Sequence, residues 1–366
     1  MQRFQQYLLP GIVFQSVLIG GAYATGREIV QYGARFGAMG LWSILAIFAG
    51  FTLVAMVAYE FARLMRAYDY RSFVRHLIGP LWPVFDVLYV VMVVLTIAVV
   101  NAATGSVVER VLGWPYWVGV ALVVVLVGLL LAGGRRVIER FKTIGSVLLY
   151  GGYLVFAGLV LAKTWGHVEQ VFAAGDTRYA GTVTIGEVFF TGVLYVGYNL
   201  GVLPAALFVL DKQTERRHTL GAGLITGVMA TVPFVLTYLA LMGFYPSTDV
   251  FDAPVPWLVM LRTVGGPVLI TAFALIILWT LIETSTGMIH AVVDRIDAGL
   301  QEAGLPRLSP ARVGLFSVVV LLAAAALSHF GIIALVARGY GAMAYAFLLL
   351  FALPLLTRGL WRVLRK

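Results

Sequence analysis

The first long apolar segment of this 366-residue chain is interrupted by the stretch Gly20-Gly21-Ala22-Tyr23-Ala24-Thr25-Gly26-Arg27-Glu28. Three glycines, a threonine and an Arg-Glu pair stand where a lipid-embedded helix needs about 20 apolar residues. Backbone groups that leave a helix at membrane depth must face protein, water or a ligand, because lipid offers them no hydrogen bonds. We therefore expect a broken helix here, with substrate contacts from Gly20, Gly21, Ala22, Thr25 and Gly26.

The amino-acid composition indicates whether the chain folds in water or in a lipid bilayer. Hydrophobic residues make up 61% of the positions and charged residues 12%, and the mean hydropathy of +0.95 exceeds that of soluble domains. We expect an integral membrane protein embedded in a lipid bilayer. The net charge of +9 falls between apolar runs and forms no aromatic-basic stripe, so we expect no nucleic-acid partner.

Motifs for enzymatic chemistry are missing from the sequence. The chain has no cysteine, no P-loop, no paired-histidine metal motif and no Gly-x-Ser-x-Gly. We expect no enzymatic activity, no metal site and no cofactor other than a possible Na+ or H+ as coupling ion.

Ten membrane spans are predicted from apolar runs of about 20 residues bounded by charge, Gly or Pro. Their approximate ranges are 8–33, 38–62, 81–109, 115–132, 140–162, 185–210, 219–244, 266–292, 311–330 and 332–357. The apolar run from Val255 to Leu261 is too short to span, and we expect it to lie on the surface before the eighth span.

The connectors sort by charge. Most of the 26 Lys and Arg residues lie at the two termini or in the connectors after the second, fourth, sixth and eighth spans. The positive-inside rule then places both termini in the cytoplasm, as an even number of crossings requires. We expect one domain in the plasma membrane, and the sequence leaves its oligomeric state open.

The two halves of the chain resemble each other. A shift of 175 residues superposes the first and sixth spans, with Gly11 on Gly186 and Gly26 on Gly201. The sixth span is interrupted as well, by Gly197-Tyr198-Asn199-Leu200-Gly201 and then Pro204. Glycines in membrane helices often serve only close packing, but paired breaks in corresponding places favour an inverted repeat. We predict an all-α fold of ten helices as a 5+5 inverted repeat, about 7–165 and 183–360, with discontinuous helices 1 and 6. The second break adds four candidate substrate contacts: Gly197, Tyr198, Asn199 and Gly201.

Polar residues inside the spans extend the candidate site. Asn101 in the third span is expected to face the core and contact substrate. Glu283 lies near the middle of the eighth span, where a charge is costly and is a functional hypothesis by default. Arg27 and Glu28 either brace or gate the broken helix. Arg338 in the tenth span either forms an outer gate or extends outward to the membrane surface.

The motif from Gly20 to Ile29, supported by Gly197-Tyr198-Asn199, resembles the amino acid-polyamine-organocation transporters with the LeuT-type fold. Within that superfamily the closer resemblance is to the YkvI-like membrane proteins. The resemblance covers nearly the whole chain and implies a transporter or, in some members, a germinant-receptor subunit.

Four further residues follow from this resemblance. It implies that Thr284 and Ser285 donate hydroxyls to a sodium ion, although such side chains also bond back to the preceding turn. Glu60 resembles a glutamate that braces the unwound helices, or it pairs with nearby arginines at the interface. Lys142 resembles a lysine that replaces sodium, or it anchors a helix start. The Asn-x-x-Arg-Phe-Pro pattern of sodium-coupled relatives is missing after the break, which leaves a second ion site in doubt.

These observations predict a secondary active transporter that works by alternating access. A small polar solute, an amino acid or related amine, would bind between the two breaks, with Na+ or H+ coupling at Glu283, Thr284 and Ser285. The alternative is a ligand-binding sensor or germinant-receptor-like subunit that does not pump.

Overall fold

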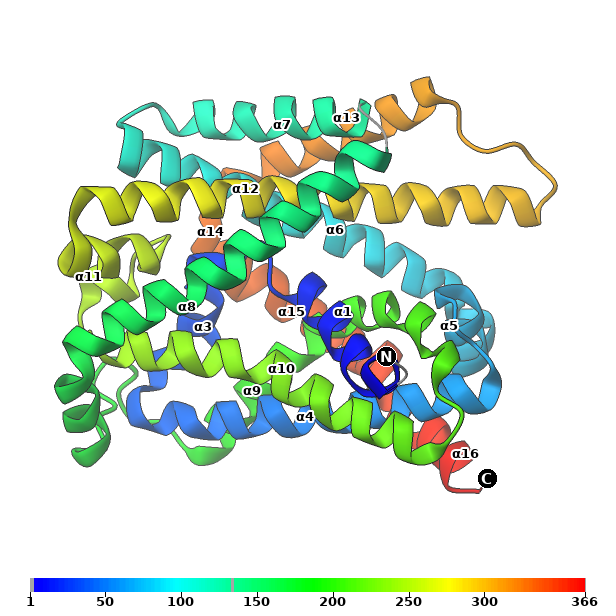
Figure 1. Cartoon of the computed structure of the whole chain (residues 1–366), viewed down its shortest axis with the longest axis horizontal. Coiled ribbons are helices and arrows are strands. Elements are labelled where there is room, and N and C mark those ends of the chain that lie inside the picture. The colour runs from blue at the N-terminus through cyan, green and yellow to red at the C-terminus, as the bar shows by residue number, and fades with distance from the viewer. Residues whose placement is uncertain (1–2, 133–134, 366) are drawn as a thin grey trace.

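The computed structural model describes residues 3–132 and 135–365, and in residues 132–150, Ala22 and Ala205 it describes the backbone alone. Every regular element in these ranges is a helix. The long helices run roughly side by side between two ends of the molecule (Figure 1). One end carries α5 (Tyr70–Ile78), the loop after α12 (Pro256–Glu302) and the C-terminus. The opposite end carries α11 (Thr248–Phe251) and the end of α8 (Arg135–Ala173).

Seven helical stretches of the described chain are long and apolar enough to cross a membrane: Ala34–Met65, Tyr70–Leu112, Ile185–Pro204, Arg216–Met242, Pro256–Glu302, Pro310–Ser328 and Gly331–Leu364. They cover the second, third and sixth to tenth predicted spans. The fourth span corresponds to α7 (Tyr116–Ala132), and the fifth lies in α8. The multi-pass helical fold is therefore confirmed, whereas the count of ten crossings stays a prediction.

The first predicted span is broken, as its glycines indicate. Helix α1 (Leu9–Leu18) ends before Ile19, and α2 (Ala22–Thr25) and α3 (Arg27–Tyr32) follow as short separate pieces. Gly21 and Gly26 adopt φ values of 53° and 84°, a region that side chains with a Cβ rarely occupy. The backbone at this depth is thus set by glycine.

The sixth predicted span also changes character at the predicted place. Helix α9 (Ile185–Asn199) gives way to a 3-10 helix, η5 (Leu200–Lys212), which contains Pro204. Proline offers no N–H to a regular helix, so the α-helical ladder cannot simply continue through it. The two interrupted segments, α1 and η5, contact each other.

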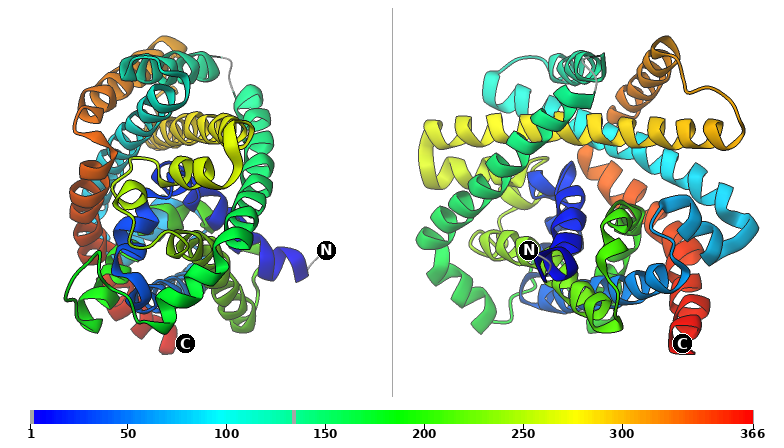
Figure 2. Two further views of the ribbon diagram at one scale, coloured as in Figure 1. Left: turned by 90° about the vertical axis from the view of Figure 1, so that its left-hand side faces the viewer. Right: turned by 45° about the vertical axis from the view of Figure 1, so that its right-hand side comes forward.

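Glycines let the helices around the breaks approach closely. Helix α4 (Gly40–Met65) packs along α10 (Arg216–Met242), where Gly223 lies against Met56 and Gly227 against Thr52. Small residues at helix crossings are the usual means of close approach in membranes, where dispersion contacts drive association. Helix α4 also packs along α9 and so holds one side of the sixth span, and its blue ribbon lies across the molecule from the yellow α12 (Figure 2).

The expectation for residues 255 to 261 is wrong. Helix α12 begins at Pro256, and its first turns are buried, with Trp257, Met260 and Leu261 0% exposed. A break at Gly266, with φ of 70°, separates these turns from the membrane-crossing part of the helix. The short apolar run is too short to cross a membrane, which favoured a surface segment, but it is buried inside the α11 end of the protein.

Helix α5 was not predicted as an element. It begins after Asp69, whose side chain accepts a hydrogen bond from the Ser72 amide, and it buries Phe73 and Leu77 while exposing Arg75 and His76. The segment was counted only as a basic connector. Its N-cap and helical periodicity were the signals that could have revealed it.

Candidate functional site

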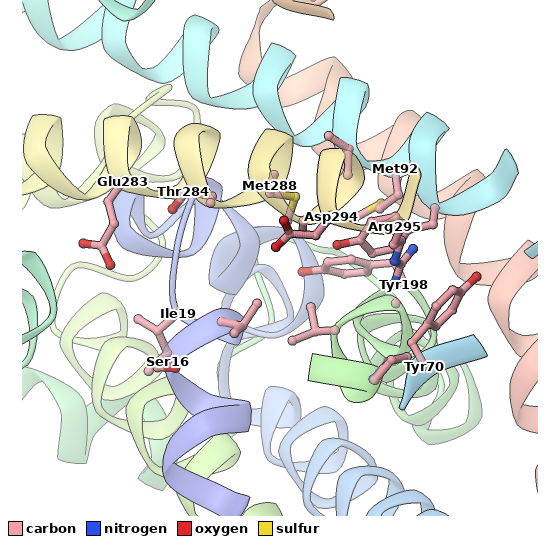
Figure 3. A pocket seen from close by; sticks show the side chains of 18 of the residues that line it. Ser16, Ile19, Tyr70, Met92, Tyr198, Glu283, Thr284, Met288, Asp294 and Arg295 are labelled. Carbon is pink, nitrogen blue, oxygen red and sulfur yellow. The ribbon is translucent and has the colours of Figure 1, made fainter. Parts of the chain in front are cut away.

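A cavity of about 610 Å³ opens between the two interrupted spans. Residues of α1, η5, α12, α5 and α6 (Trp82–Val107) line it. Figure 3 shows side chains of α1, α9 and α12 converging on this space. Its polar lining comes from Ser16, Tyr70, Tyr89, Tyr198, Thr280, Glu283, Thr284, Asp294 and Arg295. Met92, Val93 and Met288 supply an apolar part of the wall.

The break in the first span forms part of this wall. The amide of Gly21 donates a hydrogen bond of 3.3 Å to Thr284 Oγ1, and Thr284 in turn donates to the Thr280 carbonyl at 2.9 Å. A Cβ added at Gly20 would stand 2.5 Å from the same hydroxyl oxygen. One hydroxyl of α12 therefore satisfies a backbone N–H freed by the break, and only glycine allows that approach.

Opposite charges stand at two ends of the cavity. Glu283 and Arg295 both project from α12 into the cavity and lie at opposite ends of it (Figure 3). The guanidinium of Arg295 lies over the rings of Tyr70 and Tyr89, with its central carbon 3.7 Å and 3.3 Å from their centroids. Such stacking fixes a cation while leaving its N–H groups free to bind a ligand. Asp294 lies beside Arg295, so the cavity lining offers carboxylates at both ends and a guanidinium at one of them (Figure 3).

The side of the molecule around α11 is closed over the break. Arg27 donates to the carbonyl oxygens of Phe251 and Ala253, at 2.5 Å and 3.4 Å, and so ties α3 to α11. Tyr153 of α8 donates to the Tyr23 carbonyl at 3.3 Å and accepts from Trp257 Nε1 at 3.0 Å. The cavity instead extends toward Tyr70, Asp294 and Arg295, beside the basic connectors. This conformation is closed at the α11 end.

Glu28 lies behind the cavity wall. It is 5% exposed, and its carboxyl accepts a hydrogen bond of 2.5 Å from the hydroxyl of Tyr198, whose ring lines the cavity. Arg27, its neighbour, points to the carbonyl oxygens of Phe251 and Ala253 and not to Glu28. The two charged residues of the opening motif therefore have separate partners.

Of the ten predicted substrate contacts, Tyr198 and Gly201 line the cavity. Gly20 and Gly21 adjoin it through Thr284. The others have packing or backbone roles: Gly26 lies against Trp257, Gly197 against Leu348, Asn199 donates to the Tyr195 carbonyl, and Thr25 accepts from the Arg27 amide. Of Ala22 only the backbone is described.

Asn101 is buried away from the cavity. It is 0% exposed, and neither its amide nitrogen nor its oxygen has a hydrogen-bond partner among the described residues. A buried amide of this kind normally binds something, because leaving it unpaired is costly. Its predicted role as a substrate contact has no support from its position outside the cavity lining.

The predicted coupling and gating residues have diverse surroundings. Glu283 and Thr284 line the cavity, whereas Ser285 is 0% exposed and its Oγ lacks a partner in the described part of the chain. Glu60 bonds Arg63 at 2.6 Å and Thr219 at 2.6 Å, which is the arginine-paired alternative. Arg338, on the π-helix η6 (Leu335–Tyr340), is exposed. Lys142 falls in the stretch whose side chains are not described.

The half of the cavity near the basic connectors was missed. Tyr70, Tyr89 and Arg295 are far apart in sequence, and Arg295 was used only as evidence for topology. The sequence signal for this half of the cavity was the charged pair Asp294-Arg295, about three turns of helix beyond Glu283. Only the packing of α5 and α6 against α12 brings the two tyrosines to it.

Solved structures of transporters match nearly the whole chain. One is the outward-open, substrate-bound state of a Na+-coupled sialic acid symporter, 11% identical, with a TM-score of 0.56 over 97% of this chain and 84% of that one. Another is a manganese transporter from Eremococcus coleocola, 15% identical, with a TM-score of 0.56 over 97% of this chain and 78% of that one. The chain has a LeuT-type transporter fold. At these identities the likeness concerns the fold alone.

Sequence relatives point the same way. The chain is 24% identical over 254 residues to the uncharacterised membrane protein YkvI of Bacillus subtilis, covering 68% of this chain and 70% of that protein. It is 25% identical over 246 residues to the uncharacterised protein YyaD of the same organism, covering 65% and 66%. No family model matches the chain. These matches support a multi-pass membrane protein, and membership of the amino acid-polyamine-organocation superfamily stays a prediction.

Proposed function

We propose that the chain is a secondary active transporter of a small polar solute, an amino acid or related amine, in the plasma membrane. The observation that carries this is the cavity of about 610 Å³ that meets the break in the first span and presents Glu283 at one end and Arg295 at the other. A carboxylate suits an ammonium group, and a guanidinium suits a carboxylate. Twelve residues, or about 18 Å of helix, separate Glu283 from Arg295, so the amine and the carboxylate of one small solute would meet these two residues at different stages of its passage. Clefts of this size bind small molecules with a few fixed polar groups in a largely apolar wall.

The closed α11 end and the cavity near the basic connectors support alternating access. By the positive-inside rule this cavity faces the cytoplasm, with both termini on the same side. Opening of the other side requires Arg27 to leave the Phe251 and Ala253 carbonyls. A ligand or ion shifts this equilibrium only by binding the two conformations unequally.

Coupling belongs to the group Glu283, Thr284 and Ser285, beside the break. Hydroxyl, carboxylate and freed backbone oxygens suit Na+ as a hard cation, and a carboxyl group also accepts H+. Thr284 already bonds the Gly21 amide, so a change at this group acts directly on the broken helix.

The test is uptake by the purified chain in proteoliposomes, with a panel of amino acids and amines under imposed Na+ and pH gradients. Accumulation of one solute class, lost in Glu283→Gln and kept in Asp249→Asn at an exposed position in α11, supports the proposal. Binding detected by thermal shift without any uptake contradicts it and favours the sensor alternative. Uptake indifferent to both gradients contradicts the coupling.

A further inference from the structure

Glu28 is a buried acid in the first turn after the break, and neither the cavity nor the substrate hypothesis uses it. Its exposure of 5% removes it from water, and the hydroxyl of Tyr198 donates the hydrogen bond that its Oε2 accepts, at 2.5 Å. An ionised carboxylate in such a place needs a cation or several donors, because burial disfavours charge. The neighbouring side chains therefore decide whether the Glu28 carboxyl group is ionised or protonated.

The neighbours of Glu28 are aromatic. Tyr198 stacks on Tyr340 with ring centroids 4.7 Å apart, and it lies 5.4 Å from Tyr32 and 5.5 Å from Tyr195. These rings come from α3, α9 and η6, so the first, sixth and tenth spans meet around one carboxyl group. Phenols are neutral near pH 7 and contribute no compensating charge.

The nearest arginines are engaged elsewhere. Arg27 binds the Phe251 and Ala253 carbonyls, and Arg35 stacks over the ring of Phe36 with its central carbon 4.6 Å from the centroid. Among described side chains, the titratable or charged groups around Glu28 are Arg27 and Tyr32 of α3, Arg35 of η2 (Ala34–Met39), Tyr153 of α8, Tyr195 and Tyr198 of α9, and Tyr340 of η6. Neither Arg27 nor Arg35 forms an ion pair with Glu28.

Tyr198 separates Glu28 from the cavity. Its ring lines the cavity wall while its hydroxyl holds the carboxyl behind that wall. Helices α3 and α9 are the pieces next to the two breaks, and they contact each other. Movement of one break relative to the other would expose the carboxyl to water.

We propose that Glu28 is a proton-binding site that couples protonation to closure of the α11 end, a role that rests on the transporter function proposed above. The carboxylate takes up a proton from water when the α11 end is open. The resulting neutral carboxylic acid then enters the tyrosine cage, the group of rings formed by Tyr32, Tyr195, Tyr198 and Tyr340. It returns the proton to water when the cage opens. The bond formed and broken is the O–H bond of the carboxylic acid, and the proton is exchanged only with water.

The test uses the absence of cysteine from the chain. A single cysteine at Ser16, an exposed residue that lines the cavity, reports by its rate of maleimide modification whether the cavity is open. The rate at each pH is divided by that of a cysteine at the exposed Gln301, which cancels the titration of the thiol itself. No solute is added.

With Glu28 intact, the ratio falls by about tenfold between about pH 6 and about pH 9, because ionisation drives the chain toward the conformation in which the carboxylate meets water. In Glu28→Gln the ratio is high and independent of pH, and in Glu169→Gln, at an exposed position of α8, the wild-type profile remains. Glu28→Asp keeps the pH dependence with a shifted midpoint. A wild-type profile in Glu28→Gln, or a flat profile in wild type, overturns the proposal.

A second measurement needs no substitution at Glu28. Infrared spectra of the chain labelled with 13C-glutamate show whether a protonated glutamic acid is present near pH 7, and Glu283→Gln removes the contribution of the other cavity glutamate. A labelled carboxylic acid band supports the proposal, and its absence overturns it even if Glu28→Gln fails to fold. These readouts are independent of uptake, so a chain that moves no solute can still show the Glu28 profile.

Discussion

The backbone amide of Gly21 and the hydroxyl of Thr284 are joined by a hydrogen bond of 3.3 Å across 263 positions of sequence. It links the break in the first span to the middle of α12. The Thr284 hydroxyl also donates to the Thr280 carbonyl, as threonines in helices commonly do. The same oxygen therefore stabilises both its own helix and the non-helical backbone at Gly21.

Thr284→Val should destabilise the chain more than Thr286→Val. Both threonines bond back to their own helix, but only Thr284 also accepts from a freed amide. Loss of an acceptor for a buried N–H costs about 1–3 kcal/mol. Thermal unfolding in detergent measures the difference, and equal melting temperatures would contradict the structural role of the Gly21 bond.

Gly20→Ala should be destabilising because the new Cβ would stand 2.5 Å from Thr284 Oγ1. Gly158→Ala in α8 is the matched control, since a Cβ there has open space and an Ala favours a helix over Gly by about 1 kcal/mol. Adding Thr284→Ala to Gly20→Ala should restore part of the loss. No recovery in the double variant would show that the close approach is not the cause.

Arg27→Gln should loosen the closed end of the molecule. Hydrogen bonds from a charged donor contribute about 1.5–3 kcal/mol, and two of them hold the carbonyls of Phe251 and Ala253. Hydrogen exchange in α11 should rise in this variant. Arg178→Gln removes an exposed partner of Asp176 at the same end and should leave exchange in α11 unchanged.

Arg295→Met should separate solutes by whether they carry a carboxylate. Met keeps apolar packing against Tyr70 and Tyr89 but removes the guanidinium. Binding of a zwitterionic amino acid should weaken by about tenfold or more, and binding of the corresponding simple amine should change little. Arg338→Met, at an exposed position, is the control. Equal weakening of both solutes would contradict a carboxylate-binding role.

The broken first span and the change in the sixth were predictable because Gly and Pro act locally. Gly21 and Gly26 have the positive φ values that their residue type permits, and the α-helix of the sixth span ends within the predicted Gly197–Gly201 stretch. The packing of distant segments carries no such local signal. Tyr70 and Tyr89 meet Arg295 only in the folded chain, and Trp257 is buried although its segment is short.

The candidate site shows the same division between local and long-range information. Glu283 and Thr284 follow from charge and hydroxyl groups within one span, and both line the cavity. Asn101 has an equally polar character, yet its position on α6 directs it into the core, where it is fully buried. Which face of an almost wholly apolar helix meets the cavity depends on its neighbours, so hydropathy alone does not decide it.

Helix α12 continues unbroken from its bend at Gly266 to Glu302, where the last carboxylate bonds Arg71 of α5 at 2.5 Å. About 18 residues, or about 27 Å at 1.5 Å per residue, separate Thr284 from that end. A tilt of about 5° around Thr284 would therefore displace Glu302 by about 2 Å, which is enough to part an ion pair. A small shift at the break beside Thr284 is therefore enlarged at α5, whose Tyr70 lines the cavity.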